Sequence, residues 1–182
     1  METVNSRLWL LSGQRGVGKT AFCVALARLA QLEGWQVGGL LTPAIFIGGA
    51  KTGILAENLK TGETHPLASL VQSAPFDLPL GKWYFDRSVI AWGNRVLRDS
   101  LPCDLLIIDE YGPLELLRHE GWWASVDVLS RKEFRAALVV VRPELEGFAR
   151  QALNISRTII LGYDQAIEPS VRSFWAKISG ND

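Results

Sequence analysis

Eight residues near the start of the chain have the types and spacing needed to hold a row of phosphate groups. The segment 13–20 reads GQRGVGKT and matches the pattern G-x-x-x-x-G-K-[ST]. Its glycines allow the backbone to wrap closely around phosphate oxygens, with N–H groups pointing inward. Lys19 is expected to reach the β- and γ-phosphates, and the Thr20 hydroxyl to ligate Mg²⁺. The predicted nucleotide-binding residues of this loop are Gly13, Gln14, Arg15, Gly16, Val17, Gly18, Lys19 and Thr20.

Two adjacent acids end an aliphatic run and predict the second half of such a site. Asp109 and Glu110 close the segment 103–110, which reads CDLLIIDE. A buried strand ending there would deliver Asp109 beside the phosphate loop, where it can hold Mg²⁺. Successive strand residues point to opposite faces, so Glu110 needs a separate task, and we expect it to orient or deprotonate the attacking water. The predicted catalytic residues are thus Lys19 and Glu110, the predicted metal ligands are Thr20 and Asp109, and the predicted nucleotide contacts also include Asp109, Glu110, Gly112 and Pro113.

Short aliphatic runs alternate with segments of helical spacing along the chain, which predicts the elements that position these residues. Strands are expected at 7–12, 35–42, 103–110, 136–141 and 158–161. Helices are expected from the phosphate loop to Gly34 and at 86–100, 122–133, 144–153 and 165–178. This alternation predicts an α/β fold with a mostly parallel sheet that helices cover on both faces.

The middle of the chain departs from that alternation. Residues 43–63 contain short mixed runs punctuated by glycine pairs, which predict antiparallel hairpins at the side of the sheet. Residues 64–81 contain three prolines and are expected to form a loop with a short helix.

Composition bounds the possible classes of protein. The chain has 182 residues, of which 48% are hydrophobic and 21% are charged, and these values fit one soluble globular domain over 1–182. Lys and Arg number 19, as do Asp and Glu, so no global positive field favours nucleic acid. The two cysteines are too far apart for a zinc site and fit a reducing cytoplasm. No apolar run reaches the ~20 residues of a membrane span.

The residues after the acidic pair resemble a known family. The segment 109–116 reads DEYGPLEL and is similar to the D-E-x-G-P-x-E-L signature of a small P-loop nucleoside-triphosphatase family, which includes a thermophilic archaeal-type enzyme and a human cancer-related relative. Three weaker segments resemble the family in the same order: GLLTP at 39–43, KTGI at 51–54 with LKTGE at 59–63, and GKW at 81–83. The resemblance implies a RecA-like sheet with an antiparallel side extension. It also implies Mg²⁺-dependent hydrolysis of ATP, GTP and other nucleoside triphosphates with loose base choice.

Several further residues are candidates for a role beyond structure. Arg15 could lie over the γ-phosphate or be a solvated charge of the loop. Lys82 and Arg142 could each stabilise charge in the transition state or form a pair at the surface. Glu115 could position water or cap a helix. The pair Trp122-Trp123 fits a helix packed on the sheet, a partner surface or a base-stacking wall.

Two other functions remain open from the residues alone. A nucleotide or nucleoside kinase would use the insertion at 43–63 as an acceptor lid, but that insertion contains no arginine, and the Asp-Glu pair favours attack by water. A nucleotide-dependent switch or partner-binding ATPase would turn over little on its own, with Trp122-Trp123 as the partner patch. The oligomeric state is open, with a monomer slightly favoured.

Overall fold

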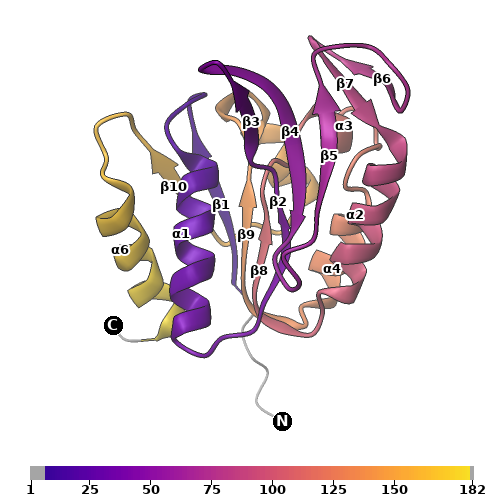
Figure 1. The fold of residues 1–182 in the computed structure, drawn as a ribbon. Helices are drawn as coiled ribbons and strands as arrows, with labels where there is room; N and C mark the ends of the chain where they lie inside the picture. Colours follow the sequence, from indigo (N-terminus) through magenta and orange to yellow (C-terminus); the bar gives the residue numbers. More distant parts are fainter. Residues whose placement is uncertain (1–6, 181–182) are drawn as a thin grey trace.

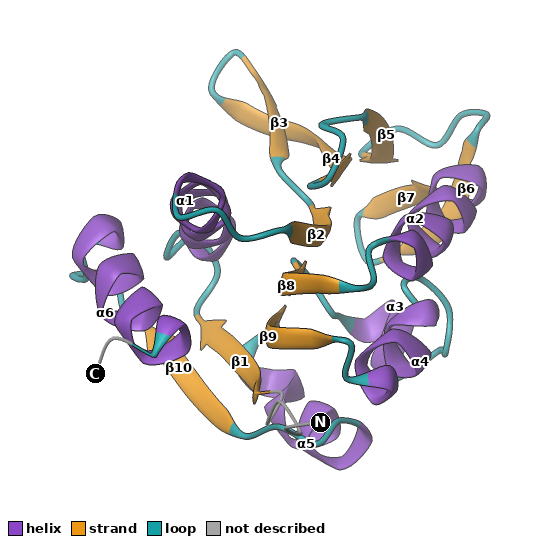
Figure 2. Cartoon of the chain, turned by 90° about the horizontal axis from the view of Figure 1, so that it is seen from below, coloured by secondary structure: helices purple, strands orange, loops and turns teal. Residues whose placement is uncertain are grey.

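The computed structural model describes residues 7–180, and five parallel strands form one side of its sheet. Figures 1 and 2 show these strands between two layers of helices. The strands lie in the order β10–β1–β9–β8–β2, and each pairs in parallel with its neighbours. Their bounds are β1 (Arg7–Gly13), β2 (Val37–Leu41), β8 (Cys103–Ile108), β9 (Phe134–Val140) and β10 (Arg157–Leu161). The predicted α/β architecture is therefore confirmed, with every predicted parallel strand present.

Side chains alternate along these strands and build a separate hydrophobic core on each face of the sheet. In β1, Leu8 and Leu10 pack into one core, whereas Trp9 and Leu11 pack into the other. Helices α1 (Lys19–Leu32) and α6 (Ile167–Ser179) cover the Trp9 face. The opposite face is covered by α2 (Arg87–Asp99), α3 (Pro113–Leu116), α4 (Ala124–Arg131), α5 (Glu146–Ala152) and the 3₁₀ turn η1 (Pro143–Leu145).

An antiparallel extension continues the sheet beyond β2. Its strands are β3 (Ala44–Ile47), β4 (Ala50–Asn58), β5 (Thr64–Ser69), β6 (Phe76–Leu80) and β7 (Trp83–Asp86). Strand β4 pairs antiparallel with β2, the order then runs β4–β5–β7–β6, and β3 pairs with β4 alone. The extension predicted at 43–63 is present but continues to residue 86.

The loop predicted at 64–81 is confined to residues 70–75, which include Pro75, and the predicted short helix is wrong. The rest of the segment forms β5 and β6, because Pro66 and Pro79 occupy places that a sheet tolerates. Pro79 lies in β6, which is the outermost strand at this end of the sheet. A proline has no N–H to donate, so it is compatible with an edge strand. Pro66 lies beside a shift in the β4–β5 register, where one residue of β5 is left without a partner.

The carboxyl ends of the parallel strands bring the predicted site residues to one edge of the sheet, as is general for this architecture. The phosphate loop follows β1, and the acidic pair follows β8. Strand β9 separates β1 from β8, so the residues after β9 lie between the loop and the acids. Arg142, two residues beyond the end of β9, takes this central position.

None of the helices within 7–180 combines the length and the apolar character that a membrane span requires.

Candidate active site

The phosphate loop follows β1 and leads directly into α1, with Gly18 at the N-cap of the helix. Gly13 has φ 149°, and a Cβ at this position would lie 2.5 Å from the carbonyl oxygen of Leu161. Only glycine fits there, because the loop turns tightly against β10. The free N–H groups at the start of α1 and the helix dipole make this end of the helix favourable for an anion.

Lys19 lies folded across the loop that precedes it. Its Nζ donates hydrogen bonds to the carbonyl oxygens of Gly13 at 2.5 Å and Gln14 at 2.9 Å. Burial lowers the pKa of Lys19 from its usual range, while the nearby Glu110 carboxylate opposes that change. The ammonium group is thus held in a poorly solvated site, where a phosphate oxygen would be a stronger partner than the two carbonyls.

Asp109 is buried at the end of β8 and is fixed by Thr42, which follows β2. The backbone N–H of Thr42 donates to Oδ2 of Asp109 at 3.0 Å, and its hydroxyl Oγ1 lies 3.1 Å from the same oxygen. Burial raises the pKa of Asp109 to about 6, against the hydrogen bonds from Thr42 and Thr20 that favour the ionised form. Two neighbouring strand ends therefore hold one carboxylate in a set orientation.

The oxygen donors at this point fit a hard divalent cation. Asp109 supplies a carboxylate and Thr20 a hydroxyl, both of which are ligand types that Mg²⁺ accepts. Within residues 7–180 there is no cluster of three or more His, Cys, Asp or Glu side chains that would hold a metal alone. This pattern is typical of Mg²⁺ sites that use one or two protein ligands and complete the shell with phosphates and water.

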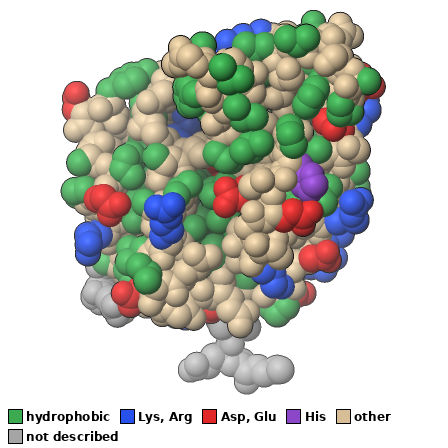
Figure 3. Space-filling model, in the orientation of Figure 1, with side chains coloured by type: hydrophobic (Ala, Val, Ile, Leu, Met, Phe, Trp, Pro, Cys, Tyr) green, Lys and Arg blue, Asp and Glu red, His purple; other side chains and the backbone are tan. Residues whose placement is uncertain are grey.

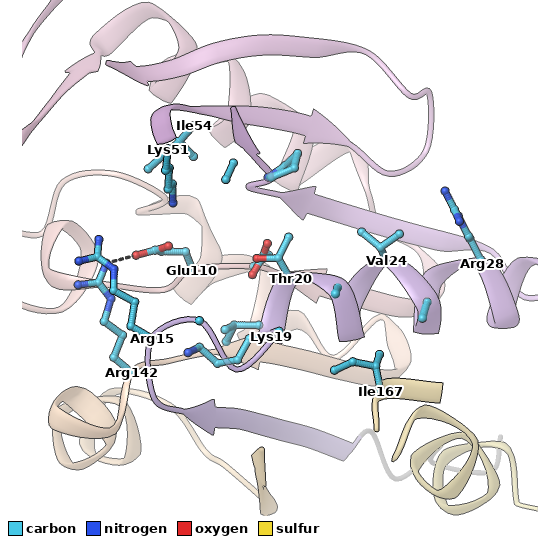
Figure 4. Close-up of a pocket in the computed structure, with 18 of the residues that line it drawn as sticks. Arg15, Lys19, Thr20, Val24, Arg28, Lys51, Ile54, Glu110, Arg142 and Ile167 are labelled. Atoms are coloured by element: carbon cyan, nitrogen blue, oxygen red, sulfur yellow. Dashed lines mark hydrogen bonds and ion pairs between the residues drawn. The ribbon is translucent and has the colours of Figure 1, made fainter. Parts of the chain in front are cut away.

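Glu110 leaves the strand in an unusual backbone conformation. Its φ is +69°, in the left-handed region that side chains other than glycine rarely adopt. The turn directs its carboxylate into the cavity beside the phosphate loop, where it forms an ion pair with the guanidinium of Arg142 (Figure 4). The side chains of Glu110 and Arg142 are 40% and 38% exposed, so both remain accessible to a ligand.

A cavity of about 1020 Å³ runs from these charged residues along the outer face of α1 (Figure 4). Arg15, Lys51, Glu110 and Arg142 gather at one end of it, above the loop. The other end follows α1 past Val24 to Arg28, and β3 contributes Ala44 and Phe46. The space-filling view shows this face of the molecule hollowed between α1 and the extension (Figure 3). One end thus suits a polyphosphate and the other suits an apolar ring.

Lys51 adds a positive charge from the β3–β4 hairpin. Its side chain points into the cavity, and its Nζ lies 5.3 Å from the centre of the Trp83 ring. Burial lowers the pKa of Lys51, the Glu110 carboxylate raises it, and the Arg15 guanidinium lowers it further. Lys51 is not among the site residues predicted from the sequence, in which the segment KTGI showed only a resemblance to the family.

Glu115 is buried and holds the turn that follows the acidic pair. Its Oε2 accepts a hydrogen bond from the Gly112 N–H at 2.8 Å, and its Oε1 accepts one from the Trp122 N–H at 2.7 Å. Burial raises the pKa of Glu115 to about 7, although both hydrogen bonds lower it. Of the two roles considered for Glu115, capping is therefore the one that its contacts support.

The remaining candidates divide between interior and surface. Trp122 is buried against Gly93, where any Cβ would lie 2.3 Å from the indole ring. Trp123 is 53% exposed, and the Arg98 guanidinium lies over its ring at 4.4 Å. Arg15 is exposed, and its carbonyl oxygen accepts a hydrogen bond from the Tyr163 hydroxyl at 3.0 Å.

Lys82 lies outside the main cavity, although its Nζ is 5.3 Å from the Trp83 ring centre. Gly112 lines the main cavity and Pro113 does not. The structure thus brings Lys19, Thr20, Asp109, Glu110 and Arg142 together.

Comparisons with known proteins identify relatives of the chain. A family model described as NTPase matches residues 9–157. Nucleoside-triphosphatase THEP1 of Pyrococcus abyssi is 37% identical over 117 residues, which cover 62% of each protein, and its counterpart from Caldivirga maquilingensis is 29% identical over 84% of each. The alignment thus spans less than two thirds of the Pyrococcus protein. The solution structure of a human cancer-related nucleoside triphosphatase matches with a TM-score of 0.74, at 20% identity, over 97% of this chain and 99% of that one.

Proposed function

The chain belongs to the NTPase family, and from that membership together with the geometry of its site we propose that it hydrolyses nucleoside 5′-triphosphates to diphosphates and phosphate. The observation that carries this proposal is the placement of Lys19, Asp109 and Glu110 around one cavity at the edge of the sheet. In this proposal the loop binds the phosphates, Asp109 holds the metal, and Glu110 accepts a proton from the attacking water.

The binding step rests on the phosphate loop and the cations around it. The loop N–H groups and the N-terminus of α1 bind the β- and γ-phosphates. Lys19 exchanges its two carbonyl partners for phosphate oxygens. Lys51 and Arg142 face the same end of the cavity and add positive charge there.

Thr20 and Asp109 would hold Mg²⁺, which neutralises charge on the phosphate oxygens when bound. Burial makes the ionised form of the Asp109 carboxylate unfavourable, and a cation bound beside it would stabilise that form. Thr42 keeps Oδ2 in place through both of its hydrogen bonds.

Glu110 would act as the base. When the triphosphate draws the Arg142 guanidinium toward its γ-phosphate, the Glu110 carboxylate becomes free to accept a proton from water. Positioned proton transfer of this kind contributes typically 10²–10⁴-fold in rate. Arg142 would then stabilise the charge that develops on the γ-phosphate.

We further propose that the site accepts nucleoside triphosphates with different bases at similar rates. We also propose that residues 1–182 act as one functional unit and that the protein is located in the cytoplasm. The base end of the cavity has apolar walls at Val24 and Ala44. The sequence also lacks the N-K-x-D motif that specifies guanine.

The test is a steady-state assay of phosphate release from ATP with Mg²⁺, using wild-type protein and the variant Lys19→Ala. We expect the variant to lose turnover and to bind triphosphate far more weakly, because the loop loses its mobile charge. Lys177→Ala is a matched control, since Lys177 lies in the last turn of α6, away from the site. Undiminished hydrolysis by Lys19→Ala, or no hydrolysis by the wild type, would overturn the assignment. The second result would favour a switch that turns over only with a partner.

A further inference from the structure

A second cavity of about 280 Å³ adjoins the first on the far side of Glu110. Six residues line both cavities: Arg15, Ile54, Trp83, Glu110, Gly112 and Arg142. The carboxylate that serves as the base therefore faces both spaces.

The walls of the second cavity are mainly aromatic and aliphatic. Trp83 and Phe85 come from β7, and Trp122 precedes α4. Further apolar side chains come from β4, β5, β6, α2 and α3, namely Ile54, Leu67, Leu80, Ile90 and Leu114. Such a lining suits a flat apolar ring and is unfavourable for a triphosphate chain.

The volume of this space exceeds what hydrolysis needs. A single water occupies about 30 Å³ in the liquid, whereas the cavity measures about 280 Å³. Apolar walls also give water few hydrogen-bonding partners. Three charged residues lie where the two cavities meet, namely Arg15, Glu110 and Arg142, and the second cavity alone also has polar groups from Thr42, Lys82 and Glu115. A ligand with an apolar ring and a hydroxyl group could place the ring against the walls and the hydroxyl at Glu110.

We propose that the second cavity binds a hydroxyl-bearing aromatic compound of nucleoside size, and that its hydroxyl competes with water for the γ-phosphoryl group. The proposal rests on the triphosphate site proposed above. The hydroxyl oxygen forms a bond to the γ-phosphorus while the bond from that phosphorus to the β,γ-bridging oxygen breaks. The electron pair of that bond leaves with the nucleoside diphosphate, and the hydroxyl proton passes to the Glu110 carboxylate. The products are a phosphate monoester and a diphosphate.

The test measures how the phosphoryl group is partitioned between water and the added acceptor. Wild-type protein is given ATP and Mg²⁺ with adenosine, guanosine, cytidine, uridine or thymidine, and phosphate and diphosphate are both quantified. Hydrolysis alone gives a ratio of inorganic phosphate to ADP of one. We expect at least one nucleoside to lower that ratio to about one half or less, and mass spectrometry to detect the phosphorylated nucleoside.

Leu80→Trp is designed to fill the cavity without touching the triphosphate site, because Leu80 lines only the second cavity. It should return the ratio to one while hydrolysis without acceptor stays within about twofold. Leu70→Trp is the matched control, since Leu70 is exposed directly after β5 and lines neither cavity. If Leu80→Trp fails to fold, Phe85→Ala should instead raise the nucleoside KM at least tenfold.

A ratio of one with all five nucleosides in a wild-type protein that hydrolyses ATP would overturn this proposal alone. Transfer that survives Leu80→Trp unchanged would also overturn it. The absence of both products with wild-type protein would instead remove the proposed hydrolytic function, and this proposal with it.

Discussion

The carboxylate of Glu110 pairs with the guanidinium of Arg142, although 32 residues separate them in the chain. The pair joins the end of β8 to the end of β9, directly beside the phosphate loop. Each group satisfies the charge of the other in the free protein. A bound triphosphate would compete for Arg142, and in the proposed mechanism this competition would free the Glu110 carboxylate to act as the base.

The first prediction concerns Glu110. Glu110→Gln keeps the shape of the side chain and removes the base, so we expect kcat to fall at least ~100-fold. Binding of Mg²⁺-ATP should stay within a few-fold, since the carboxylate contributes little to ground-state binding. Single-turnover kinetics and a binding titration would check the two values. Full kcat in this variant would exclude Glu110 as the base and favour proton transfer through the substrate.

The second prediction concerns Arg142. Arg142→Ala should lower kcat by ~10²-fold or more, because one donor to the transition state is lost. Arg131→Ala removes an exposed arginine from α4 and should have no effect. The double variant with Glu110→Gln should lose less than the product of the two single losses, because the residues act on each other. Strictly multiplicative effects would contradict that coupling.

The third prediction concerns how Thr42 positions Asp109. Asp109→Asn should raise the Mg²⁺ concentration needed for half-maximal activity, since a charged ligand becomes neutral. Thr42→Val removes the hydroxyl that binds Oδ2 and keeps the backbone N–H. For Thr42→Val we expect the Mg²⁺ concentration needed for half-maximal activity to rise about tenfold, which corresponds to the loss of one hydrogen bond to a charged group. Thr158→Val on β10 serves as the control, and an unchanged Mg²⁺ dependence for Thr42→Val would refute the positioning role.

The fourth prediction concerns base choice. ATP, GTP, CTP and UTP should be hydrolysed with kcat/KM values within about tenfold of one another, a window of ~1.4 kcal/mol. The apolar walls at Val24 and Ala44 offer few groups that distinguish the bases. Parallel assays of the four nucleotides would settle the point, and a thousandfold preference would show that a specific base contact exists.

The fifth prediction concerns Glu115 and pH. Burial raises its pKa from 4.5 to about 7, so the folded protein binds this proton more tightly than the unfolded chain does. This tighter proton binding adds roughly 3 kcal/mol to the free energy of unfolding. The contribution is fully present below pH ~4.5 and is lost as the pH rises through ~7. Urea unfolding of the wild type and of Glu115→Gln at pH 5 and pH 8 would measure it. The wild type should lose more stability than the variant over this interval, and parallel profiles would show that Glu115 stays ionised.

The sequence by itself determined the local parts of this protein. The phosphate loop could be predicted because its glycines, lysine and threonine act within eight consecutive residues. The buried parallel strands could also be predicted, because their aliphatic runs are short and lie between helical segments. The acids after β8 were found for the same reason.

Only the tertiary structure decided which distant residues meet. Thr42 contacts Asp109 and Arg142 contacts Glu110 because β2 and β9 are both neighbours of β8. Local spacing does not encode strand order, since that order depends on how whole faces of the sheet are buried. The same holds for β5 and β6, where prolines favour a loop locally but occupy a register shift and an edge strand in the folded sheet. The second cavity likewise arises only when the extension packs against α2 and α3.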